Sequence, residues 1–136
     1  MNNTRTILYV EDDAIVLTAY QNRLQQAGFN VVPARDGLEA IKHLSTLAPD
    51  LVLLDLLLPR FNGGEVLQFM RNQKSLALVP VIILATNSIV DVAHEQMLES
   101  ASKRIIKSFC TPVILLAAIQ EVLAGENSAK PQAALA

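Results

Sequence analysis

Short apolar runs alternate with helical patterns along this chain of 136 residues, and this alternation restricts the fold more than any other feature. Each run is followed by apolar residues at helical spacing. The runs predict strands at residues 7–10, 30–34, 51–55, 81–85 and 103–107. Strands that alternate with helices indicate a parallel sheet joined by right-handed helical crossovers. We therefore expect an α/β fold with a doubly wound five-stranded parallel sheet flanked by five helices.

Residues that favour helix starts support this division of the chain. Asp13 is expected to cap the first helix, and Asp36, with Glu39 three residues later, forms a capping box for the second. Thr111 and Pro112 suit the N-cap and first position of the last helix. A fourth helix is predicted between the fourth and fifth strands.

Length and composition fit a single folded domain. The chain is 51% hydrophobic with only 4% aromatic residues, so its core is expected to consist of Leu, Ile, Val and Ala. No internal repeat or second domain is visible. We expect one domain over residues 1–124 and a flexible C-terminal tail, or a truncated linker, over residues 125–136.

Charge and targeting signals narrow the location and the partners. The formal net charge is −2 and no basic block is present, so direct nucleic-acid binding is not expected. The single cysteine, Cys110, allows no internal disulfide and fits a reducing compartment. The N-terminal apolar stretch is too short for a signal peptide, and no run is long enough to cross a membrane. A cytoplasmic protein without a membrane partner is the resulting expectation.

Acidic residues gather where two predicted strands end. Glu11 and Asp12 follow the first strand, and Asp55 ends the third. The carboxyl ends of parallel strands meet at one edge of a sheet, so these carboxylates should lie close together. Such a cluster is costly unless a cation holds it, and oxygen ligands with room for water suit Mg²⁺. A carboxylate beside such a metal can attack a phosphoryl group, because the metal shields its charge.

Other roles exist for these charged residues. Acids are also common at helix starts, where the helix dipole favours them, so the acids after the first strand are ambiguous by themselves. Asp55 favours the metal site, because an acid at the end of the apolar strand LVLLD has little reason to be there as packing. Lys107 ends the fifth strand and could pair with a carboxylate or a phosphoryl oxygen, although most lysines are simply solvated.

Three segments of the chain, ILYVEDD, PDLVLLDLLLPRFNGGEVL and RIIKSF, resemble the response-regulator receiver family of two-component signalling. The resemblance covers residues 5–124. It implies a flavodoxin-like, CheY-like fold with strand order 2-1-3-4-5, and a receiver domain over residues 1–124. It also implies that Asp55 is the phosphoacceptor and that Lys107 contacts the phosphoryl group. The implied Mg²⁺ ligands are Asp12, Asp55, Glu11 through water, and the backbone carbonyl of Leu57.

The same resemblance implies the partners and the output. The phosphoryl group would come from a phosphohistidine on a sensor histidine kinase or a histidine phosphotransfer protein. The chain would then catalyse only its own phosphorylation and dephosphorylation, and would signal through protein contacts. The usual dimer or effector face in the family combines the fourth helix, fifth strand and fifth helix. Seven consecutive apolar residues from Val113 to Ile119 exceed one buried stripe, so part of this run is expected to face outward, unless it is simply core.

The chain departs from the family pattern at the positions that transmit the signal. Ala85 stands where the family has a switch hydroxyl, and Thr86 lies one residue late. Arg104 replaces an inward-turning aromatic residue, and Ser108 replaces a proline after the lysine. We therefore expect Asp55 to accept phosphate while the usual coupling is absent.

Two alternatives to a phosphoacceptor module are open. A pseudo-receiver would use the same fold as a phosphorylation-independent protein-interaction domain. A metal-dependent phosphohydrolase would need a second aspartate two residues after the nucleophile, where this chain has Leu57.

Overall fold

A computed structural model of the chain describes residues 4–58, 60–85 and 99–135, with side chains described as far as residue 125. The predicted fourth helix and Thr86 lie outside the described residues. The structure therefore tests the five strands, the site at their carboxyl ends and the remaining helices.

The strands form one parallel sheet in the order β2-β1-β3-β4-β5, as expected. Their bounds lie within one residue of the predicted runs. They are β1 (Thr6–Val10), β2 (Asn30–Ala34), β3 (Leu51–Asp55), β4 (Val81–Ala85) and β5 (Lys103–Ile106). β5 ends one residue early because Lys107 begins a 3-10 turn, η2 (Lys107–Phe109).

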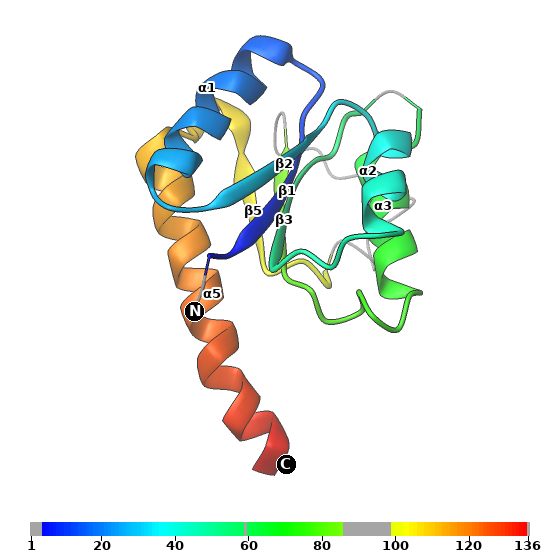
Figure 1. Cartoon of the computed structure of the whole chain (residues 1–136), viewed down its shortest axis with the longest axis vertical. Helices are drawn as coiled ribbons and strands as arrows, with labels where there is room; N and C mark the ends of the chain where they lie inside the picture. The colour runs from blue at the N-terminus through cyan, green and yellow to red at the C-terminus, as the bar shows by residue number, and fades with distance from the viewer. Residues whose placement is uncertain (1–3, 59, 86–98, 136) are drawn as a thin grey trace.

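Helices cover both faces of this sheet (Figure 1). The described helices are α1 (Ala14–Gln26), α2 (Gly37–Leu44), α3 (Gly63–Arg71) and α5 (Pro112–Leu135). Figure 1 shows α1 and α5 on one side of the sheet and α2 and α3 on the other. Because α5 runs through the segment for which the sequence predicts a tail, the boundary at residue 124 stays a prediction. None of the helices described could span a bilayer, since none is both long enough and apolar enough.

The core consists of two apolar clusters, one on each face of the sheet. Along β1, Ile7 and Tyr9 belong to the cluster under α1 and α5, and Leu8 and Val10 belong to the cluster under α2 and α3. Every residue of β3 is buried. A strand covered on both faces has no solvent side, which explains why these runs are continuously apolar rather than alternating.

Capping residues fix the helix starts that border the carboxyl edge of the sheet. Asp13 Oδ1 accepts the backbone N–H groups of Ile15 and Val16, as predicted. Thr111 Oγ1 accepts the N–H of Ile114, which confirms the start of α5.

The predicted capping box of α2 forms only in part. Asp36 accepts the N–H of Glu39 at 2.8 Å. The Glu39 carboxylate accepts the N–H of Arg35, one residue before the expected donor. A complete capping box, which the sequence analysis did not identify, joins Asn62 and Glu65 at the start of α3.

Candidate functional site

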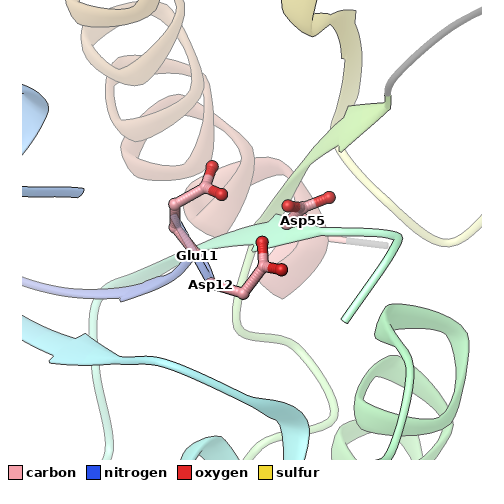
Figure 2. A group of neighbouring side chains, drawn as sticks. All are labelled: Glu11, Asp12 and Asp55. Carbon is pink, nitrogen blue, oxygen red and sulfur yellow. The ribbon is translucent and has the colours of Figure 1, made fainter. Parts of the chain in front are cut away.

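Three carboxylates meet where two central strands end. β1 and β3 are neighbours, with Val10 paired to Leu54, so Glu11 and Asp12 leave the sheet beside Asp55. One carboxylate oxygen from each acid lies within 4.8 Å of the others. Figure 2 shows the three side chains gathered in one place. The structure thus brings together the acids that the sequence analysis selected.

The three acids differ in their environment. Glu11 is fully buried and Asp55 is 2% exposed, whereas Asp12 is exposed. Burial raises the pKa of Glu11, and hydrogen bonds from the Lys107 side chain and the Asp13 backbone oppose that shift. Buried carboxylates are costly unless they are paired, so the two inner acids require a cation.

Lys107 supplies one positive charge to both buried acids. Its Nζ lies 2.9 Å from Glu11 Oε1 and 3.1 Å from Asp55 Oδ2. Desolvation lowers the pKa of Lys107, but its hydrogen bonds to Glu11 and Asp55 outweigh that effect, and the net shift is upward. The lysine stands at the start of η2, so it reaches across the edge of β4 to the acids on β1 and β3.

Both oxygens of the Asp55 carboxylate are engaged. Oδ1 accepts the backbone N–H of Leu57 at 3.0 Å, and Oδ2 accepts Lys107. The backbone at Gly63 lies close to the end of β3, since a Cβ on Gly63 would collide with the backbone carbonyl of Asp55. The carboxylate is therefore held in one orientation before any ligand arrives. The structure does not test the predicted role of the Leu57 carbonyl as a metal ligand.

The charges and donors of the cluster fit a divalent cation. Three carboxylates and one ammonium group leave a formal charge of −2 when all are ionised. Lys107 Nζ donates a hydrogen bond to Glu11 Oε2, 3.2 Å away. The other oxygen, Oε1, is buried and has an ionic contact with Nζ. Among the described residues, Oε1 has no hydrogen-bond partner. Carboxylate oxygens with one exposed member suit Mg²⁺, which keeps part of its water shell.

Three positions expected to transmit a signal, Ala85, Arg104 and Ser108, lie outside the acid cluster. Ala85 ends β4, is half-buried and pairs with Ile106 of β5. Arg104 is exposed on β5, and Ser108 is exposed in η2. The residues that the structure describes contain no cis peptide bond. The role expected for these three positions in transmitting a signal stays a prediction.

A cavity of about 160 Å³ lies behind Lys107 and is lined in part by Tyr9, Tyr20 and Cys110. Tyr20 donates its hydroxyl to the carbonyl oxygen of Cys110 at 3.0 Å, and burial is the main reason that its pKa rises to about 12. Burial also raises the pKa of the Cys110 thiol. A raised pKa leaves less of the thiol as the reactive thiolate, so nothing in its surroundings marks Cys110 as a reactive group.

Sequence reasoning missed one contact to the acid cluster. Arg35, directly after β2, donates Nε and Nη2 to the backbone carbonyl of Asp12 at 3.2 and 3.0 Å. The sequence carries no signal for this contact, because a charged residue after a strand is ordinary and its partner lies 23 positions away.

Comparison with known proteins agrees with this geometry. The family model of the response regulator receiver domain matches residues 7–120. The chain is 39% identical over 80 residues to the alkaline phosphatase synthesis transcriptional regulatory protein PhoP of Bacillus subtilis, a match that covers 59% of this chain and 32% of PhoP. The chain spans less than two thirds of the length of the curated relatives it matches first.

Solved structures are similar over most of the chain. The signal receiver domain of a signal transduction histidine kinase from Syntrophus aciditrophicus has a TM-score of 0.77 at 30% identity, covering 90% of this chain and 92% of that one. The receiver domain of a sensor histidine kinase from Pseudomonas aeruginosa, with magnesium coordinated in its active site cleft, has a TM-score of 0.79 at 24% identity, covering 89% of this chain and 98% of that one.

Proposed function

We propose that this chain, which belongs to the response regulator receiver domain family, accepts a phosphoryl group on Asp55 and signals through protein contacts. The donor is a phosphohistidine on a sensor histidine kinase or a histidine phosphotransfer protein. The observation that carries the proposal is the Lys107 ammonium group held between the buried carboxylates of Glu11 and Asp55. Most lysines are exposed to solvent, whereas Lys107 pairs with two buried acids.

Mg²⁺ is the cofactor that this arrangement fits. Asp12 and Asp55 would bind it directly, Glu11 through water, and Leu57 through its backbone carbonyl. When bound, the ion would neutralise the charge between the attacking carboxylate and the incoming phosphoryl group. The likeness to a solved receiver domain that has magnesium in its active site cleft supports the assignment.

Phosphoryl transfer then needs few movements of the chain. One carboxylate oxygen of Asp55 forms a bond to phosphorus while the phosphorus–nitrogen bond of the phosphohistidine breaks, and the imidazole nitrogen keeps the electron pair. The N–H of Leu57 holds the Asp55 carboxylate in place. Lys107 moves its hydrogen bond from Asp55 to a phosphoryl oxygen and keeps its ion pair with Glu11. The chain acts on no other substrate, and water reverses the modification at the same site.

Intact mass spectrometry after incubation with acetyl phosphate and Mg²⁺ tests this function. The wild-type chain should gain one phosphate, and Asp55→Asn should gain none, because an amide is a poor nucleophile. Asp13→Asn is the matched control: it makes the same substitution two residues from Glu11, and Asn caps a helix as well as Asp. An adduct on Asp55→Asn, or none on the wild type, would contradict the proposal.

A second candidate is a phosphorylation-independent interaction domain, which the residues at Ala85, Arg104 and Ser108 favour. These residues lack the hydroxyl, aromatic and proline groups of the family pattern. Under this alternative, the wild type would take no phosphate either from acetyl phosphate or from a phosphohistidine protein, while still binding its partner. The mass measurement therefore separates the two candidates.

The output surface is proposed at β5 and α5, and the predicted fourth helix, the third part of this face, lies outside the described residues. Val113 and Ile114 are 68% and 47% exposed, whereas Leu115 and Ile119 are buried. The apolar run of α5 thus serves the core and also faces outward, as the sequence predicted. A homodimer or an effector could cover this outer stripe. We place the protein in the cytoplasm, with no nucleic-acid or membrane partner.

A further inference from the structure

Three of the four proposed Mg²⁺ ligands lie on two loops outside the sheet, whereas the fourth, Asp55, is the last residue of β3. The first follows β1 and carries Glu11 and Asp12. The second follows β3 and carries Leu57. The three residues Arg35, Asp36 and Gly37, which we call the β2–α2 corner, contact both loops.

Arg35 holds the first loop by its backbone. Its guanidinium donates two hydrogen bonds to one oxygen, the carbonyl of Asp12. The preceding residue, Ala34, accepts the N–H of Glu11 at 3.0 Å. The backbones of Glu11 and Asp12 are therefore both tied to the end of β2. Only arginine has a planar fork that can make this paired contact, and a lysine ammonium group cannot reproduce it.

Asp36 and Gly37 hold the second loop. Asp36 Oδ2 accepts Nη2 of Arg60 at 2.8 Å. The missing side chain of Gly37 makes room for the Phe61 carbonyl, which a Cβ would overlap. Arg60 and Phe61 both have positive φ, 43° and 72°. Left-handed backbone at two consecutive non-glycine residues persists only where the surroundings enforce it.

We propose that the β2–α2 corner sets the separation between the first loop, which carries Asp12, and the second loop, which carries Leu57. This separation would then determine the Mg²⁺ affinity. Three adjacent residues fix two loops that come from different strands. In the described contacts, the corner touches the backbone of the two loops and the Arg60 side chain, and none of the carboxylates of Glu11, Asp12 and Asp55. It would therefore affect Mg²⁺ binding by positioning the ligands, not by contact with the ion. The part that concerns Mg²⁺ rests on the proposed function.

Mg²⁺ titration of Arg35 variants distinguishes positioning from charge. Loss of a group that orients metal ligands typically weakens affinity about 10- to 100-fold. We expect Arg35→Ala and Arg35→Lys both to raise the Kd for Mg²⁺ about tenfold, measured by NMR titration. If Arg35 acted only through its positive charge, Arg35→Lys would bind as the wild type does, and Arg35→Ala would bind more tightly. Arg23→Ala, which removes an exposed arginine from α1, is the control for charge and should leave the Kd unchanged.

Amide hydrogen exchange without metal gives an independent readout. In Arg35→Ala, exchange should rise several-fold at Asp13, whose N–H bonds to Glu11 Oε2, and not at Gly63. In Arg60→Ala the pattern should reverse, since the Gly63 N–H bonds to the Leu56 carbonyl of the second loop. A merely structural loss would raise exchange throughout the sheet.

Either of two results would overturn the proposal: Arg35 variants with the wild-type Kd, or exchange that rises equally at both loops in both variants. The exchange measurement needs neither metal nor phosphate. The proposed function could therefore fail in the mass assay while the β2–α2 corner is upheld, and the corner could fail while Asp55 is phosphorylated.

Discussion

Ala85 stands at the position where the proposed receiver function would place a switch hydroxyl. Asp55 pairs with Leu84 across the sheet, so Ala85 lies one residue beyond the level of the acid and next to β5. Its methyl group cannot donate a hydrogen bond to a phosphoryl oxygen. None of the described contacts of Lys107 with Glu11 and Asp55 involves Ala85, so the proposed phosphorylation and its proposed transmission can be tested separately.

We therefore predict that Ala85→Thr responds to phosphorylation more strongly than the wild type does. With a phosphate mimic bound, we expect the change in amide exchange along β4 and β5 to be several-fold larger in Ala85→Thr than in the wild type, because the hydroxyl can follow the phosphoryl group. Ala85→Val is the matched control, since valine has the shape of threonine without the hydroxyl. A threonine variant that responds no more than the valine variant would contradict this account.

At the scale of one element, α2 depends on its N-cap, Asp36. The Asp36 carboxylate accepts the N–H of Glu39 and pairs with Arg60. Hydrogen bonding from the Glu39 backbone, and then from Arg60, lowers the pKa of Asp36 below its ordinary value. Both contacts favour the ionised form, so the start of α2 is coupled to pH.

The pH dependence of unfolding follows with a defined sign. A carboxyl whose folded pKa is lowered contributes stability that is complete above its unfolded pKa, about 3.9, and is lost as the pH falls through the lower folded pKa. Asp36→Asn keeps the capping oxygen but does not titrate. The difference in free energy of unfolding between wild type and Asp36→Asn, measured with urea, should therefore shrink from about pH 6 to about pH 3. Arg60→Ala should keep part of this pH dependence, because the hydrogen bond from the Glu39 backbone remains. If the difference in free energy of unfolding between wild type and Asp36→Asn stayed constant with pH, this account of Asp36 would be refuted.

At the scale of the whole molecule, the sheet is stabilised by two separate apolar layers. Leu54, in the central strand β3, is fully buried in the layer under α2 and α3. Leu78, in the connection before β4, is 90% exposed. The same residue type thus occupies both extremes of environment in one chain, which allows a direct comparison.

Leu54→Ala should lower the free energy of unfolding by about 2–5 kcal/mol, because it removes buried methyl groups and leaves a cavity. Leu78→Ala should change it by no more than about 0.5 kcal/mol. Urea unfolding of the two variants measures the difference. If the two variants lost equal free energy of unfolding, the apolar layer under α2 and α3 would not be part of the stabilising core.

Much of the architecture was predictable because it follows from local patterns. The apolar runs match β1, β3 and β4 to within one residue, since a strand buried on both faces must be apolar throughout. Asp13 and Thr111 cap their helices as predicted, because a cap bonds to groups only two or three residues away. The Asn62 capping box was missed, since the loop around it carries no clear helical period.

The sequence by itself determined which residues end the strands of a parallel sheet, and hence that Glu11, Asp12, Asp55 and Lys107 share one edge. That conclusion needs only chain direction and sheet type. The tertiary structure alone decided how these residues meet. Lys107 forms two ion pairs, one oxygen of Glu11 is buried, and Arg35 donates hydrogen bonds to the Asp12 carbonyl. These contacts join segments far apart in the sequence. Their geometry depends on strand register and on loop backbone angles, which no local pattern specifies.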